Sequence, residues 1–234
     1  GLFLFTSGIG YKRYPIVGPF NSDFYSIDWH DDKLAIASGR LNGKLPSFSR
    51  NGVHLFENES WDFHNITNVQ AWEDKNIWDF IDVAVNPSNT AEVAVASYSE
   101  EPLSIFNNDS VTLYNDLNST LEFTESGNGW SLVSSVSYDP DGNLWALNGY
   151  TDKPLNVRDA NGDWMNFDCG GSARNIYTKK MIIDFNDQVW FASENKGLFG
   201  YNHNGSINNS NDDQYVQLTS GTNYQGCQPV NYTR

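Results

Sequence analysis

The sequence is poor in basic side chains. Only 14 of its 234 residues are Lys or Arg, against 29 Asp and Glu, which gives a formal net charge of −15 at pH 7. Proteins approach nucleic acids and anionic lipid surfaces mainly through clusters of Lys and Arg that neutralise phosphates. The composition therefore makes nucleic acid and anionic lipid poor candidate partners.

Cysteine is almost absent as well. Cys169 and Cys227 could form one disulfide in an oxidising compartment, but two free thiols fit the sequence equally well. No Cys-X-X-Cys or Cys-X-X-His spacing occurs, and the four histidines are scattered without His-X-His or His-X-X-X-His spacing. Such spacings are typical of zinc sites. We therefore expect no metal site and no bound cofactor.

Long hydrophobic runs are missing too. No stretch approaches the roughly 18 consecutive apolar residues of a membrane-spanning helix, so we expect no membrane span in this chain. The apolar opening, residues 1–5, has no basic segment before it and is more typical of a strand than of a signal peptide. Because the chain begins at Gly1, we expect a processed protein or a piece of a longer one.

Aromatic residues and asparagine are abundant. The chain holds 8 Trp, 12 Tyr, 14 Phe and 29 Asn, and 39% of its residues are hydrophobic, which is enough to form a core. Asn, Gly, Ser and Asp interrupt the apolar segments about every eight to twelve residues, a spacing typical of short strands and turns. We therefore predict an all-β protein without long helices.

A unit of four short strands recurs along the chain. In the third copy the expected strands are residues 133–138, 144–148, 155–157 and 164–167, and they follow one another as hairpins. The same order returns in each of four copies, which we place at residues 24–67, 78–116, 131–169 and 179–218. A fixed repeat of this kind decides the fold before any single strand does.

The spacing of the copies selects the fold class. The second strands begin at Leu34, Val93, Leu144 and Val189, so the intervals are 59, 51 and 45 residues. Four antiparallel strands about every 40 to 50 residues are typical of β-propeller blades, whereas a β-sandwich shares the short strands but not the repeated order. We predict one β-propeller domain over residues 1–234 with about four whole blades. Extra residues at 40–51 and 120–129 should form loops on the binding face.

The two ends of the chain suggest a further, partial blade. Residues 1–21 are similar to the last two strands of a unit, and residues 223–234 could begin another. The ends could pair into a split fifth blade, or the chain could be an open piece of a larger propeller. An open piece would expose long strand edges, which isolated proteins rarely tolerate. We therefore expect closure by the ends, by oligomer formation or by a partner chain.

The second-strand segments resemble a known repeat. Residues 141–145, Asp-Gly-Asn-Leu-Trp, and residues 189–202 are similar to the "DGNLW…NGGLYRY" repeat of the two-component-regulator propellers of Bacteroidota. The PorZ-like propellers associated with the type IX secretion system are the better match at residues 82–89, 113–119 and 139–155. The likeness covers residues 78–205 and, loosely, the first unit. It departs at the polar loop 202–213 and at the C-terminus.

This resemblance implies a non-enzymatic binding or scaffold module at the cell surface or in the periplasm. In the PorZ-like case the module would be associated with type IX secretion or surface attachment, and its partners would be proteins or glycans, including lipopolysaccharide. The alternative that the resemblance leaves open is the sensory ectodomain of a hybrid two-component system that recognises an oligosaccharide. Neither family supplies catalytic residues, and none is carried over.

No residue pattern indicates catalysis. The turn at residues 139–143 has the Asp-X-Asp-Gly-Asn pattern of some calcium loops, but it is too short for an EF-hand and matches a hairpin turn. Pairs of carboxylates such as Glu100 and Glu101 lie in polar turns, and no Gly-X-Ser-X-Gly elbow occurs. We expect no enzymatic activity.

Two tryptophans are the candidates for ligand contact. Trp72 and Trp130 fall in connections between the predicted strands, whereas Trp145 and Trp190 occupy equivalent positions within second strands. An aromatic ring in a polar loop can stack on a sugar ring, while repeated positions indicate packing between blades. We predict ligand stacking at Trp72 or Trp130, with ordinary burial as the alternative.

Overall fold

The computed structural model describes residues 2–6, 10–14, 18–124 and 129–220. Within these ranges the regular structure consists of β-strands and two single 3-10 turns, η1 (Gln70–Trp72) and η2 (Gly171–Ala173). The prediction of an all-β protein is confirmed. In the described part of the chain, no helix has the length and apolar character needed to cross a membrane.

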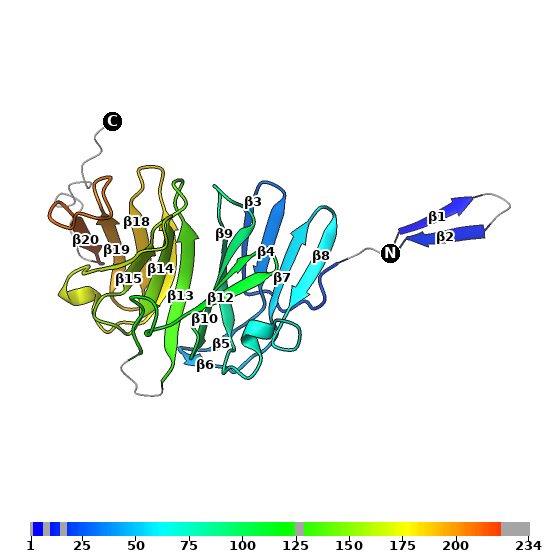
Figure 1. Cartoon of the computed structure of the whole chain (residues 1–234), viewed down its shortest axis with the longest axis horizontal. Helices are drawn as coiled ribbons and strands as arrows, with labels where there is room; N and C mark the ends of the chain where they lie inside the picture. Colours follow the sequence, from blue (N-terminus) through cyan, green and yellow to red (C-terminus); the bar gives the residue numbers. More distant parts are fainter. Residues whose placement is uncertain (1, 7–9, 15–17, 125–128, 221–234) are drawn as a thin grey trace.

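Most of the strands form four antiparallel meanders of four strands each, which we call blades 1 to 4 (Figure 1). Blade 1 consists of β3 (Ser26–His30), β4 (Lys33–Ala37), β7 (Val53–Glu57) and β8 (Ser60–His64). Blade 2 consists of β9 (Phe80–Val85), β10 (Glu92–Ser99), β11 (Leu103–Asn107) and β12 (Ser110–Tyr114). Blade 3 consists of β13 (Ser131–Tyr138), β14 (Leu144–Gly149), β15 (Leu155–Arg158) and β16 (Trp164–Phe167). Blade 4 consists of β17 (Thr178–Ile183), β18 (Val189–Ser193), β19 (Gly197–Asn202) and β20 (Gln214–Leu218).

The blades follow one another in space as they do in the sequence. The first strands β3, β9, β13 and β17 contact one another in succession, and Figure 1 shows blade 1 and blade 4 at opposite ends of the row. Blades 2 and 3 are also joined by a short ladder in which Tyr98 faces Leu132 and Ser99 faces Ser131. The blades thus stack face to face along their first strands, as blades do in a propeller.

An apolar layer fills the space between each pair of consecutive blades. Side chains of β4 and β7 meet those of β9 and β10 between blades 1 and 2, and similar layers lie between blades 2 and 3 and between blades 3 and 4. In β10, Val93, Ala94, Val95 and Ala96 are all at most 1% exposed, because neighbouring blades cover both faces of the sheet. The core of the protein is therefore this series of layers.

Two short hairpins lie outside the blades. β5 (Leu41–Asn42) pairs with β6 (Leu45–Pro46) inside the long connection between β4 and β7. β1 (Leu2–Thr6) pairs with β2 (Gly10–Tyr14), and Figure 1 shows this hairpin apart from the blades, beyond β8. The predicted partner segment, residues 223–234, lies outside the described residues, so a split blade formed by the two ends stays a prediction.

The turns that carry the family resemblance have a structural role. The Asp139 carboxylate accepts hydrogen bonds from the backbone N–H groups of Asp141 at 3.1 Å and Asn143 at 2.8 Å, and from the indole N–H of Trp145 at 3.0 Å. In blade 4 the carboxylate of Asp184 accepts the indole N–H of Trp190 at the same spacing, at 3.0 Å. The aspartate of each turn therefore ties the hairpin to the tryptophan of the second strand.

A buried histidine makes the stability of blade 1 depend on pH. The His54 ring is fully buried, its Nδ1 lies 3.1 Å from the Ser38 hydroxyl, and its Nε2 has no hydrogen-bond partner among the described residues. Burial lowers the pKa of His54 below its ordinary value of 6.5, with a smaller contribution from His64. Below pH 6.5 the unfolded chain therefore binds a proton that the folded chain does not.

We therefore predict that the free energy of unfolding decreases as the pH falls through 6.5, by at most about 1.4 kcal/mol per pH unit from this group. The decrease ends where the pH reaches the lowered pKa of the folded state. Urea unfolding of the wild type and of His54→Phe between about pH 7.5 and pH 5.5 measures the difference. Phe63→Leu, which alters the ring 4.7 Å from His54 without removing the titrating group, should keep the wild-type slope. Equal slopes for the wild type and His54→Phe would contradict this account.

Candidate ligand-binding site at the hub of the blades

One carboxylate joins the first strands of all four blades. Asp82 of β9 is 1% exposed and accepts hydrogen bonds from the hydroxyls of Ser26 in β3 at 2.5 Å and Ser135 in β13 at 2.6 Å. The ammonium group of Lys180 in β17 donates to both oxygens of Asp82, at 2.6 and 2.9 Å. The backbone N–H of Val136 adds a further bond at 3.0 Å. Because blades 1, 3 and 4 all supply partners to this carboxylate of blade 2, Asp82 marks the hub of the structure.

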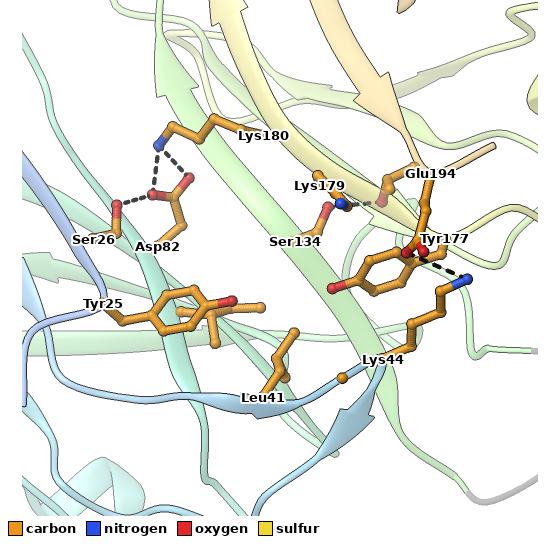
Figure 2. Close-up of a pocket in the computed structure, with 13 residues that line it drawn as sticks. Tyr25, Ser26, Leu41, Lys44, Asp82, Ser134, Tyr177, Lys179, Lys180 and Glu194 are labelled. Carbon is orange, nitrogen blue, oxygen red and sulfur yellow. Dashed lines mark hydrogen bonds and ion pairs between the residues drawn. The ribbon is translucent and has the colours of Figure 1, made fainter. Parts of the chain in front are cut away.

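A cavity of about 550 Å³ opens beside this hub (Figure 2). In Figure 2 the hydroxyls of Tyr25 and Tyr177 point toward one another across the cavity, with Asp82 and Lys180 on one side and Lys44 on another. We call this space, and the side chains that line it, the hub cavity. Its lining combines phenol rings with charged groups from blades 1, 2 and 4.

The insertion in blade 1 reaches across the hub to blade 4. The ammonium group of Lys44, between β5 and β6, lies 3.4 Å from the Glu194 carboxylate and 5.6 Å from the centre of the Tyr177 ring. The insertion begins at Gly39, where a Cβ atom would lie 2.3 Å from backbone atoms of Phe80. Only glycine allows the chain to leave blade 1 this close to β9, so the path of the insertion is set at its first residue.

A second, more apolar hollow adjoins the hub cavity. It has a volume of about 390 Å³, and we call it the aromatic groove. Its lining residues are Lys44, Leu45, Pro46, Phe48, Tyr98, Trp130 and Tyr150. Lys44 also lines the hub cavity, and the Tyr150 ring lies 5.9 Å from the Tyr177 ring, so the two hollows are neighbours.

A residue of the first predicted insertion meets the residue that follows the second one in this groove. Phe48 comes from the first insertion, and Trp130 directly follows the second. Their ring centres lie 5.4 Å apart in an edge-to-face arrangement, and Trp78 packs against Trp130 at the same distance. Trp130 remains partly exposed, and Phe48 is 53% exposed. Aromatic faces are therefore open to a ligand where Phe48 and Trp130 meet.

A buried aspartate holds the first insertion in place. The Asp79 carboxylate is 0% exposed and accepts the backbone N–H groups of Ser47 at 2.7 Å, Phe48 at 3.0 Å and Ser49 at 2.9 Å. Phe48 has a φ of 59°, in the left-handed region that a non-glycine residue adopts only when its surroundings fix it. Burial raises the pKa of Asp79, and the three backbone hydrogen bonds oppose that rise. Asp79 thus positions the Phe48 ring over the groove.

The phenols of the hub cavity stay protonated at neutral pH. Burial, followed by the nearby groups Tyr25, Tyr150 and Glu194, raises the pKa of Tyr177 to about 12. Burial and the negative charges of Asp82 and Asp79 also raise the pKa of Tyr25. Both hydroxyls can therefore donate hydrogen bonds to a ligand.

The two tryptophans predicted to stack on a ligand have different environments. Trp72 is 0% exposed, its indole N–H donates to the Ser104 hydroxyl at 2.9 Å, and its ring packs on Phe80 and Phe106. It lies in the core between blades 1 and 2, so the alternative of ordinary burial applies and Trp72 is not available to a ligand. Trp130 lines the aromatic groove and remains a candidate.

The one described cysteine, Cys169, lies in the core layer between blades 3 and 4 and lines neither hollow. In the parts of the chain that the structure describes, no group of three or more His, Cys, Asp or Glu side chains is placed to hold a metal ion. Burial raises the pKa of the Cys169 thiol to about 12, so this group is a poor nucleophile at neutral pH. Cys227, its possible disulfide partner, lies outside the described residues.

The hub residues Asp82 and Lys180 were not among the candidates that the sequence indicated. The sequence nevertheless contained a signal. The first strand of each blade carries a polar residue at the equivalent position, namely Ser26, Asp82, Ser135 and Lys180. Recognising it requires aligning the first strands of the four repeats rather than the second. Lys44 carried no comparable signal, because the insertion occurs in one blade only.

The stack of four-stranded blades has the propeller-like fold that the repeat predicted. No protein-family model matches the sequence, and no curated protein matches it. Among solved structures, PorZ, a bacterial surface component of the type IX secretion system of Porphyromonas gingivalis, is similar with a TM-score of 0.74. The two chains are 23% identical, and the match covers 92% of this chain and 30% of PorZ. This chain therefore spans less than a third of the length of the PorZ chain.

Two further structures show the same fold. The extracellular domain of a protein described as a hybrid two-component system of B. thetaiotaomicron is 14% identical with a TM-score of 0.52, over 93% of this chain and 25% of that one. A streptogramin B lyase is 12% identical with a TM-score of 0.55, over 86% of this chain and 56% of the lyase. The predicted resemblance to PorZ-like and two-component-regulator propellers is thus confirmed at the level of the fold. The lyase shows that a related fold can also carry an enzyme.

The hydrogen bonds at the hub predict that substitutions at Asp82 and at Lys179 differ in their effect on the free energy of unfolding. Asp82→Asn removes the charge that four donors share and should lower the free energy of unfolding by roughly 3 kcal/mol. Lys179→Met, at an exposed position beside Lys180 in β17, should leave the stability unchanged. Chemical denaturation monitored by tryptophan fluorescence measures both. Equal stabilities of Asp82→Asn and the wild type would show that the Asp82 carboxylate does not hold the blades together.

Proposed function

We propose that this chain is a non-enzymatic β-propeller binding module that holds a glycan in the aromatic groove and the hub cavity. The observation that carries the proposal is that the two hollows are neighbours and share Lys44, which lines both. A sugar ring offers apolar C–H faces to an aromatic ring and hydroxyls to polar groups around it. Trp130 supplies the aromatic ring, and the Tyr177 hydroxyl and the Lys44 ammonium group supply polar partners.

The charges of the hub cavity favour a glycan that bears phosphate or carboxylate groups, as lipopolysaccharide does. Three of the chain's 14 basic residues, Lys44, Lys179 and Lys180, line this one cavity, although the chain as a whole carries a net charge of −15. Lys44 and Lys180 are paired with carboxylates, whereas Lys179 is exposed and makes no ion pair with a described residue. A local excess of ammonium groups in an acidic protein selects an anionic ligand at that place.

The absence of enzymatic activity is part of the proposal. Hydrolysis of a glycosidic bond commonly requires two carboxyl groups free to act as acid and as base or nucleophile. Asp82 and Glu194 are the two carboxylates that line the cavity, and both are paired with lysines. Asp82 also accepts hydrogen bonds from two serines, so its lone pairs are committed to the fold.

The cellular role that best fits this module is surface attachment or type IX secretion outside the cytoplasm. The support is the likeness in fold to PorZ, which is described as a surface component of that system. Because the match covers only 30% of PorZ, the role of the whole protein is also a proposal. The alternative is a sensory ectodomain that recognises an oligosaccharide, favoured by the likeness to the two-component ectodomain. A protein partner on the same surface would serve either role.

The proposal predicts that purified lipopolysaccharide binds the chain and that Trp130→Ala weakens this binding about tenfold, which corresponds to the loss of one stacking contact. Phe185→Ala is the matched control, because Phe185 is 90% exposed in the turn between β17 and β18, away from the lining of both hollows. Isothermal titration calorimetry with lipopolysaccharide and with a neutral oligosaccharide measures the affinities.

Lys179→Met separates the two classes of glycan. It should weaken lipopolysaccharide binding and leave a neutral oligosaccharide unaffected, because it removes an ammonium group without changing the aromatic groove. Tight binding of the neutral oligosaccharide alone would favour the sensory alternative. Equal affinities of Trp130→Ala and the wild type for every glycan tested would overturn the groove as the binding site.

A further inference from the structure

The indole N–H of Trp78 has no hydrogen-bond partner among the described residues, although Trp78 is only 5% exposed. An indole nitrogen can only donate a hydrogen bond, and a buried donor without an acceptor is costly to the folded state. Trp72 and Trp145 are buried as well, but their indoles donate to the Ser104 hydroxyl and the Asp139 carboxylate. Trp78 therefore keeps a donor free that these two tryptophans use inside the fold.

Trp78 lies directly behind the lining of the aromatic groove. Its ring centre is 5.1 Å from that of Phe48 and 5.4 Å from that of Trp130, in edge-to-face arrangements. Phe48 and Trp130 line the groove, whereas Trp78 does not. The free indole N–H therefore belongs to a ring that is in direct contact with the wall of the groove.

The Phe48 side chain is the part of this wall that is free to move. Its ring is 53% exposed, and exposed side chains change rotamer within nanoseconds. The backbone below it is fixed, since the Asp79 carboxylate accepts the N–H groups of Ser47, Phe48 and Ser49. Phe48 and Asp79 both have left-handed φ values, of 59° and 52°, and such backbone conformations cluster at ligand-binding sites. The wall thus combines a rigid backbone with one movable ring next to Trp78.

We propose that the aromatic groove binds the acetamido group of an N-acetylated amino sugar, and that the Phe48 ring turns aside so that the acetamido carbonyl accepts the indole N–H of Trp78. This inference rests on the proposed function, because it names the kind of sugar that the groove takes. A sugar hydroxyl brings a donor of its own, which would need a further acceptor, whereas a carbonyl oxygen only accepts. The acetamido methyl group is apolar and matches Leu45 and Pro46 in the lining. A site with an unpaired buried donor discriminates against a ligand that lacks the acceptor.

A second tryptophan supplies the matched comparison. The indole N–H of Trp164 in β16 is also buried without a hydrogen-bond partner among the described residues. Its ring packs on Tyr114 at the outer strands, with ring centres 5.3 Å apart, and it lines neither the hub cavity nor the aromatic groove. A free indole donor alone therefore does not define a site, and the place of Trp78 behind the groove is what distinguishes it.

The experiment compares N-acetylglucosamine 6-phosphate with glucose 6-phosphate, which differ only in the acetamido or hydroxyl group at carbon 2. The wild type should bind the acetylated sugar about tenfold more tightly, as one additional hydrogen bond to a buried donor implies. Trp78→Phe should bring the ratio of the two affinities to about one, because phenylalanine keeps an aromatic ring and lacks the N–H. Trp164→Phe, the same substitution at the other unpaired indole, should keep the wild-type ratio. Titrations followed by nuclear magnetic resonance measure the four affinities and the two controls.

The indole N–H signal of Trp78 in the wild type tests the hydrogen bond without any substitution. In a proton–nitrogen correlation spectrum this signal should move downfield with N-acetylglucosamine 6-phosphate and stay in place with glucose 6-phosphate, while the signals of Trp72 and Trp164 stay in place with both. An unmoved Trp78 signal, or equal affinities of the wild type for the two sugars, would overturn the inference. If Trp130→Ala still weakens lipopolysaccharide binding in that case, the proposed function stands without it. A chain that binds neither sugar nor lipopolysaccharide would overturn both.

Discussion

The carboxylate of Asp82 is the group on which the arrangement of the blades depends. A buried carboxylate is costly unless hydrogen bonds and a counter-charge compensate it. Here Ser26, Ser135 and Lys180 supply these partners from the first strands of blades 1, 3 and 4. A strand that slipped by one residue would turn its partner side chain to the opposite face. The single carboxylate therefore links the first strands of all four blades, whereas the backbone ladder between β10 and β13 joins blades 2 and 3 alone.

The binding surface follows from the same constraint. Since the first strands are fixed at the hub, Tyr25 before β3 and Tyr177 before β17 are brought to opposite sides of one cavity. The insertion of blade 1 then spans the hub and places Lys44 beside Glu194 of blade 4. A preorganised site of this kind loses little conformational freedom when a ligand binds. The same interactions that hold the blades in register thus hold the polar and aromatic groups in place for a ligand.

The sequence allowed the local structure to be predicted, but not the contacts across the hub. The Asp139 to Trp145 spacing marks a hairpin turn because both partners belong to one hairpin. By contrast, Lys44 of blade 1 and Glu194 of blade 4 are far apart in the sequence and meet only because the four blades form a curved row. Trp72 and Trp130 are the same residue type in similar connections, and only the tertiary structure places one in a core layer and the other in a groove. Residues close together in the sequence therefore predict the turns, whereas the burial of a side chain depends on which blades pack against it.

The open arrangement of the blades leaves apolar side chains exposed at both ends of the row. The sequence suggested that an open propeller would expose strand edges, yet the outer strand of every blade presents an edge whether or not a ring is closed. What distinguishes the two ends among the described residues is apolar side chains on a sheet face, with Ile27 and Trp29 exposed at one end and Ile182 at the other. Edges can be protected locally by charge or by twist. Side chains on a sheet face are buried by packing against another surface, as Val83 and Val136 are between consecutive blades, and not by strand pairing.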